Sequence, residues 1–135
     1  MKSFFKILFF LFIIKNTLAQ DITNIVNLEL KDGTVVIEMK PDHAPEHVKR
    51  IKELISEKFY DGLKFHRVID GFMAQTGDPK GDGTGGSGQN IPAEFNSLPH
   101  IRGTVSMARA QDPDSADSQF FICFQESSFL DGQYT

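Results

Sequence analysis

The sequence predicts a mainly β fold in which an antiparallel sheet closes into a barrel. Short segments with alternating apolar and polar residues recur along the chain, tight turns join several of them, and a single segment has the apolar spacing of a helix. Alternation with a period of two is typical of a half-buried strand. Many short strands with one helix favour an antiparallel sheet, and closure removes the exposed edges of that sheet.

The first two predicted strands form a hairpin at residues 26–39. Their alternating runs flank Asp32 and Gly33, a dipeptide that suits a tight hairpin turn. A helix is predicted next, because Pro45 suits the first helical position and the apolar residues that follow share one helical face. These residues are Val48, Ile51, Leu54 and Ile55. We expect the helix to end between residues 56 and 58.

Short strands are predicted again after the helix, at residues 63–68, 72–75, 103–108 and 119–124. Two polar loops without periodicity lie among them, at residues 77–90 and 111–118. Long ordered loops in a compact domain are usually functional, although a flexible decoration is an alternative.

The first 19 residues have the pattern of a secretory signal peptide. Lys2 and Lys6 precede an unbroken apolar run at residues 7–14, and residues 17–19 offer a small-x-small cleavage site. The apolar run is too short to span a bilayer comfortably, although an uncleaved membrane anchor is an alternative. We therefore expect an exported protein in the bacterial periplasm, without stable membrane association once the signal is removed.

Residues 20–135 suit one domain, and their last residues read as a turn entering a strand, so we expect a domain that is incomplete at its C-terminus. The signal holds three of the 14 basic residues and none of the 18 acidic ones, which leaves a formal net charge of −7. An acidic chain without a basic cluster argues against nucleic acid as a partner. Cys123 is the single cysteine and lies in an apolar run, so we expect a buried, unreactive thiol.

Three motifs suggest other chemistry, and each lacks its context. Residues 81–86 match G-x-G-x-x-G, but no helix start follows, as a dinucleotide site would need. Residues 43–47 match the zinc pattern H-x-x-E-H, but Pro45 leaves His43 outside the predicted helix, so two solvated histidines are the simpler interpretation. The acidic loop at 111–118 lacks the turn glycine and closing glutamate of a calcium loop. We therefore expect neither a metal nor a cofactor.

The segment at residues 65–78 is the most informative part of the chain. It places Arg67 in an apolar, alternating run and Gln75 eight residues later, and a turn at residues 69–71 would set the two side by side. A charge in apolar surroundings is costly unless it is paired. Arg67 is therefore either a satisfied structural ion or the polar centre of an apolar binding site, and we favour the binding site.

Five blocks of the sequence closely resemble the cyclophilins, which are peptidyl-prolyl cis-trans isomerases. They are residues 65–69, 71–78, 81–86, 106–108 and 118–122, in the order that the family has them. The resemblance implies a closed antiparallel eight-stranded barrel capped by two helices, with the last strands and the second helix missing from this chain. It also implies a cofactor-independent isomerase, expected to be a monomer, that acts on proline-containing unfolded or exported polypeptides.

The resemblance also assigns the candidate site. Arg67 corresponds to the catalytic arginine and Gln75 to its neighbour in the site. The walls of the proline pocket would be Phe72, Met73, Phe121 and Leu130. The stretch along the substrate backbone would be Ala108, Arg109, Ala110 and Gln119. Phe129 and Tyr134 are the remaining candidates for substrate binding. Eukaryotic members often have Asn where Arg109 stands, Trp where Phe129 stands and His where Tyr134 stands, so this chain is similar to bacterial members and tight cyclosporin binding is not expected.

The leading hypothesis is an exported prolyl isomerase that assists the folding of other exported proteins. The alternatives are a non-catalytic proline-peptide binding module on the same barrel and a metallopeptidase built on His43 and His47. The presence of both Arg67 and Gln75 favours the enzyme, because a binding module does not need them.

Overall fold

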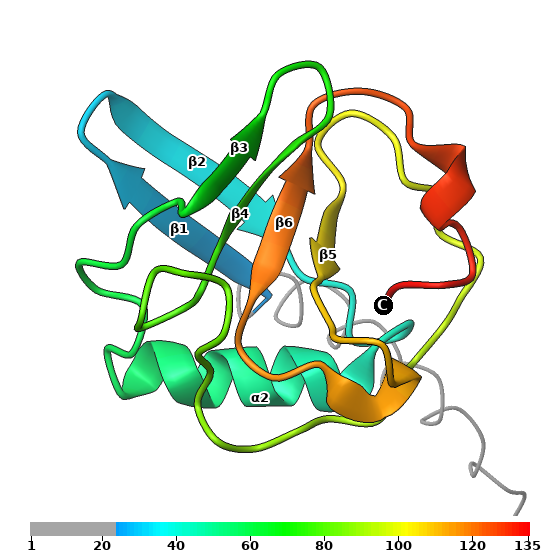
Figure 1. Ribbon diagram of the computed structural model, residues 1–135, viewed down its shortest axis with the longest axis horizontal. Helices are drawn as coiled ribbons and strands as arrows, with labels where there is room; N and C mark the ends of the chain where they lie inside the picture. The colour runs from blue at the N-terminus through cyan, green and yellow to red at the C-terminus, as the bar shows by residue number, and fades with distance from the viewer. Residues whose placement is uncertain (1–23) are drawn as a thin grey trace, which may run out of the picture. The chain divides into compact units, whose positions relative to one another are not determined.

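The computed structural model in Figure 1 describes residues 24–135. The chain divides into two units, Met1–Met39 and Lys40–Thr135. The predicted signal peptide at residues 1–19 lies outside the described residues and stays a prediction. Within the described range, every helix is too short or too polar to cross a bilayer.

The first unit contains an antiparallel hairpin of β1 (Ile25–Leu30) and β2 (Gly33–Glu38), in which each residue of one strand pairs with a residue of the other. Gly33 follows the turn with φ at +144°, a conformation that residues with side chains rarely adopt. The hairpin predicted at residues 26–39 is therefore confirmed.

The second unit begins with the predicted helix, α2 (Pro45–Ser56), which has its proline in the first turn and ends within the expected limits. The Glu94 carboxylate accepts hydrogen bonds from the backbone N–H groups of Glu46 and His47, each at 3.0 Å. These bonds satisfy two of the donors that a helix leaves unpaired at its start. A residue far along the chain thus fixes the beginning of α2.

The histidines near α2 differ from the prediction of two solvated side chains. His47 is 3% exposed, and its Nε2 atom is 2.8 Å from the carbonyl oxygen of Pro92. His43 is exposed and precedes the helix. The two rings therefore do not share a helical face, and no cluster of three metal-ligating side chains occurs in residues 24–135.

Four short strands form an antiparallel sheet in the order β3-β4-β6-β5 (Figure 1). They are β3 (Arg67–Ile69), β4 (Met73–Thr76), β5 (Val105–Met107) and β6 (Phe120–Cys123). Each overlaps a predicted strand; β3, β5 and β6 are shorter than predicted, β4 has the predicted length shifted by one residue, and β3 begins four residues later than expected. The prediction placed Lys64 in a strand. Its carbonyl oxygen accepts a hydrogen bond from the side-chain Oγ1 of Thr76 at 2.8 Å instead of a bond from the backbone of a neighbouring strand.

The expectation of a closed eight-stranded barrel is not met by the described strands, which form one sheet of two strands and one of four. The mainly β class with a single α-helix is confirmed for residues 24–135. The four-stranded sheet has β3 at one edge and β5 at the other. Two short 3-10 helices, η1 (Pro113–Ser115) and η2 (Ser128–Leu130), complete the second unit.

The core of the second unit lies on both faces of β6. Successive residues of a strand point to opposite faces, so Phe120 and Phe121 belong to different clusters. Phe120 packs with Ile91, Met107 and Ala116, and the partly buried side chains of Ile51 and Tyr60 pack against this cluster. Phe121 and Cys123 pack with Met73 and Leu130, and Phe72, Ala108 and Tyr134 cover this second group. The second cluster holds most of the apolar candidate residues.

Candidate active site

Strand register places Arg67 beside Gln75. The two residues are direct partners in the β3–β4 ladder, and Arg67 Nη1 donates to Gln75 Oε1 at 3.3 Å. The turn between the strands uses Gly71 at φ +68°, and Phe72 N donates to the Ile69 carbonyl. The juxtaposition expected from the spacing in the sequence is therefore present.

The same register continues across the sheet. Gln75 pairs with Phe121 on β6, and Phe121 pairs with Ser106 on β5. Paired residues of neighbouring strands point to the same face. One row of side chains thus runs from the charged edge strand β3, through an amide and an aromatic ring, to the opposite edge of the sheet.

A hollow of about 130 Å³ lies over this row and is called the apolar pocket below. Its lining residues are Arg67, Phe72, Met73, Gln75, Ala108, Arg109, Phe121, Leu130 and Tyr134. Nine of the candidate residues are therefore brought together. A larger depression of about 490 Å³ lies along α2, but lysine, glutamate, serine and proline make up most of its lining, and it has no arginine–amide pair.

Three candidate residues do not line the pocket. Gln119 lies directly behind it, with its Oε1 atom accepting a bond from Gln75 Nε2 at 2.9 Å. Phe129 is 66% exposed, and its ring lies 5.6 Å from the ring of Phe72. Ala110 is exposed, and its N–H donates to Ser115 Oγ. The Ala108 N–H is also used, by the Gln119 carbonyl, so neither of these alanine N–H groups is free for a peptide.

The pocket is apolar at its base and charged at its rim. Met73, Phe121 and Leu130 are 2%, 6% and 8% exposed. Arg67 is exposed, so its charge does not carry the cost of full burial. Within residues 24–135, no carboxylate lies at ion-pair distance from the Arg67 guanidinium. This cation is therefore available to an incoming group at the edge of an apolar hollow.

Arg109 lines the pocket as a second arginine. Its guanidinium carbon lies 4.8 Å from the centre of the Tyr134 ring, a cation–π arrangement. Arg109 Nε donates to the Gln133 carbonyl at 3.0 Å, and Nη1 donates to the Ala110 carbonyl at 3.0 Å. The Tyr134 ring in turn meets the Phe121 ring edge-on at 5.8 Å. These contacts fix the aromatic side of the pocket.

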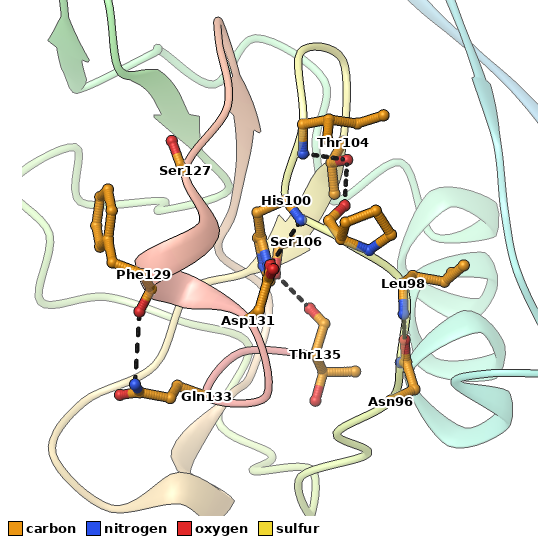
Figure 2. A network of polar contacts seen from close by, with 12 residues as sticks. Asn96, Leu98, His100, Thr104, Ser106, Ser127, Phe129, Asp131, Gln133 and Thr135 are labelled. Carbon is orange, nitrogen blue, oxygen red and sulfur yellow. Dashed lines mark hydrogen bonds and ion pairs between the residues drawn. The ribbon is translucent and has the colours of Figure 1, made fainter.

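Figure 2 shows a polar network that includes His100, Ser106, Asp131 and Thr135. The Asp131 carboxylate accepts bonds from the His100 backbone N–H at 2.8 Å and from its ring Nδ1 at 2.9 Å. The ring Nε2 lies 3.0 Å from Ser106 Oγ, and Ser106 Oγ donates to the Thr135 carbonyl at 2.7 Å. The imidazole also stacks on Phe121 at 6.2 Å.

This network has the residue types of a hydrolase triad but not the geometry of an attacking serine. Ser106 is 2% exposed, and its hydroxyl hydrogen is directed to a backbone carbonyl. A nucleophile must reach its substrate, which a buried serine cannot. The backbone N–H of His100 and its ring lower the pKa of Asp131, which keeps the supporting carboxylate ionised. Sequence reasoning missed His100 and Asp131, because 31 residues separate them along the chain.

Asp78 organises the loop that follows β4. It is 1% exposed, and its carboxylate accepts bonds from the backbone N–H groups of Lys80, Asp82 and Gly83 at 2.8, 3.1 and 2.6 Å. Burial would raise the pKa of Asp78, but these bonds, with one from Gly85, lower it to about 2. The buried Asp78 carboxylate thus takes the place of water as the hydrogen-bond acceptor for the backbone N–H groups of this loop.

The stability of the folded protein should fall in acid through Asp78. Because its pKa is lowered from 3.8 to about 2, the ionised form stabilises the folded state above pH 3.8, and this contribution is lost as the pH falls through about 2. We expect the urea midpoint to decline more steeply between about pH 5 and about pH 2 in the wild type than in Asp78→Asn. Parallel curves for the two proteins would contradict this role.

Comparison with known proteins gives consistent matches. Residues 25–135 match the family model described as cyclophilin type peptidyl-prolyl cis-trans isomerase. The chain is 55% identical over 129 residues to a probable peptidyl-prolyl cis-trans isomerase of Brucella suis, covering 87% of this chain and 66% of that protein. It is 45% identical over 109 residues to peptidyl-prolyl cis-trans isomerase B of Bacillus subtilis, covering 78% of this chain and 76% of that one.

Solved structures give the same match. A cyclophilin-type isomerase of Cryptosporidium parvum, crystallised in the presence of the dipeptide Ala-Pro, superposes with a TM-score of 0.78 at 32% identity. The alignment covers 82% of this chain and 74% of that chain. A cyclophilin of Hirschia baltica superposes with a TM-score of 0.75 at 31% identity, covering 82% of this chain and 61% of that one.

Proposed function

Because the chain belongs to the cyclophilin-type peptidyl-prolyl cis-trans isomerases, we propose that it accelerates rotation about X-Pro bonds in other polypeptides. The observation that carries this proposal is the position of the Arg67 guanidinium, which lies at the rim of the apolar pocket and donates to Gln75. The crystallisation of a related isomerase with Ala-Pro supports proline-containing peptides as substrates.

The chemistry follows from the structure of the peptide bond. An X-Pro bond resists rotation because the prolyl nitrogen shares its lone pair with the carbonyl, and the barrier is about 18–20 kcal/mol. Uncatalysed exchange therefore takes tens to hundreds of seconds, roughly. In the twisted transition state the lone pair is localised on the nitrogen. A donor cation such as Arg67 stabilises that state more than the planar one, and only such a difference increases the rate.

The rest of the site holds the substrate while the bond turns. The apolar base of the pocket, formed by Met73, Phe121 and Leu130, suits a pyrrolidine ring. Gln75 orients the guanidinium through its side-chain oxygen. The reaction forms no covalent intermediate, since no bond is made or broken when a peptide bond rotates.

The cellular role is also part of the proposal. We infer an exported, monomeric folding assistant in the bacterial periplasm, with residues 1–19 as its signal peptide, that acts on unfolded or exported chains containing proline. The basic residues and hydrophobic run at the N-terminus support export. A closed eight-stranded barrel is our proposal for the complete fold, supported by the positions of β3 and β5 at the edges of the four-stranded sheet, since closure removes exposed strand edges.

The direct test is isomerisation of a chromogenic X-Pro peptide by the full-length protein, with and without a chelator. We expect catalysed exchange that the chelator leaves unchanged. Peptide binding without catalysed exchange would indicate a proline-peptide binding module instead. Loss of turnover with the chelator would indicate metal chemistry, which the separate positions of His43 and His47 disfavour.

A further inference from the structure

A continuous series of hydrogen bonds, made by two glutamine side-chain amides, joins the glycine-rich loop (residues 81–88) to Arg67. Gln119 Nε2 donates to the carbonyl oxygens of Gly83 at 3.1 Å and Gly85 at 2.7 Å. Gln119 Oε1 accepts from Gln75 Nε2 at 2.9 Å, and Gln75 Oε1 accepts from Arg67 Nη1 at 3.3 Å. The series runs from backbone carbonyls of the loop to the cation at the pocket rim.

The loop carbonyls determine the direction of every bond in this series. A carbonyl oxygen only accepts hydrogen bonds, so Gln119 must present its NH₂ group to the loop and its oxygen to Gln75. Gln75 must then present its NH₂ group to Gln119 and its oxygen to Arg67. If the carbonyls moved away, the side-chain amide of Gln119 could rotate and exchange its oxygen and NH₂ group. Gln75 could then place an NH₂ donor against the guanidinium, which has no acceptor. The loop therefore selects the polarity of the group that faces Arg67.

Two carboxylates hold the loop in the position that this requires. Asp78 binds its first half through backbone N–H groups. Asp117 binds its second half, accepting from the N–H groups of Ser87 at 3.0 Å and Gly88 at 2.9 Å. A Cβ atom on Gly85 would lie 2.0 Å from Asp78 Oδ1. Gly85 is thus required for close packing against a buried carboxylate, which explains a glycine of the motif without any nucleotide.

We propose that the glycine-rich loop is a positioning element for the Arg67 guanidinium and acts on it through Gln119 and Gln75. This inference rests on the proposed isomerase function for its kinetic consequence. No residue of the loop lines the apolar pocket, so a displaced loop should leave proline binding in place and impair the turnover step. Asp78 and Gly85 are therefore positioning residues.

The test uses Gly85→Ala and Asp78→Asn in the full-length protein, each alone and combined with Arg67→Ala. With Arg67 present, we expect either loop variant to lower kcat by about three- to tenfold, the effect of losing roughly one net hydrogen bond, with KM little changed. In the Arg67→Ala background the same variants should have no further effect, because contacts that act through one residue are not additive. Thr84→Ala is the matched control, since its hydroxyl binds only Asp82 within the loop.

An NMR measurement separates this inference from the isomerase function. In the two loop variants the side-chain amide signals of Gln75 and Gln119 should shift or broaden, while Thr84→Ala should leave both unchanged. Equal losses of kcat in both Arg67 backgrounds, or unchanged amide signals in both loop variants, would overturn the proposal. Absence of turnover in the wild type would overturn the proposed function, and the amide signals would still test the positioning of Arg67.

Discussion

Replacing Arg67 by alanine should lower kcat/KM for X-Pro isomerisation by more than tenfold, to about one hundredth at the extreme. A hydrogen bond to a charged group contributes about 1.5–3 kcal/mol, and each 1.36 kcal/mol is about a factor of ten in rate. Binding of a proline peptide should change little, because the base of the pocket consists of other side chains, Met73, Phe121 and Leu130. A coupled assay for turnover and a titration for binding measure the two effects separately.

Arg67→Lys is the informative control for this prediction. Lysine keeps the positive charge but loses the planar set of donors that lets arginine bind Gln75 and a substrate atom together. We expect a rate between those of the wild type and Arg67→Ala. Full activity in Arg67→Ala would refute the role of the guanidinium, and weakened binding at an unchanged kcat would make Arg67 a binding residue.

Replacing Phe121 by alanine should lower the free energy of unfolding by about 3–5 kcal/mol, a large part of a typical domain's stability. Phe121 is 6% exposed, lies on the inner strand β6 and contacts the rings of His100 and Tyr134. The substitution removes the ring that separates the apolar pocket from the network behind it. Urea unfolding measures the loss, and the peptide titration should show weaker proline binding where the variant remains folded.

Phe129→Ala is the matched control, because it deletes the same side chain at a position that is 66% exposed. We expect it to cost less than about 1 kcal/mol. Equal losses of stability for the two variants would contradict the assignment of Phe121 as the central wall of the pocket.

The local features of the fold could be predicted from the sequence. The alternating runs and the proline of the helix start located the hairpin, α2 and the regions of all four further strands. The strand limits could not be predicted, because hydrogen-bond partners distant in sequence determine them. Leu63 and Phe65 alternate as a strand would, yet Lys64 binds a threonine side chain instead of a ladder partner. His47 shows the same limit, since its buried position depends on a carbonyl of Pro92.

The candidate site was predictable to the extent that strand register governs it. Spacing placed Arg67 beside Gln75, and the ladder pairs them. Phe129 could not be placed from the sequence, because an aromatic residue in a short 3-10 helix can face either the pocket or the solvent, and this one faces mainly the solvent. The bond between His100 and Asp131 forms only when two segments distant in sequence come together in the fold. The close packing of Gly85 against Asp78 likewise depends on how the loop folds back on itself.

The most direct test of the central claim is the rate of cis–trans exchange of a proline peptide while it is bound to the protein, measured by NMR at saturating full-length protein. This rate excludes association and release, so it reports the rotation step alone. We predict that Arg67→Ala slows the bound exchange more than tenfold while the bound cis and trans populations stay nearly unchanged. An exchange rate equal to that of the wild type would contradict the claim that the Arg67 cation stabilises the twisted bond.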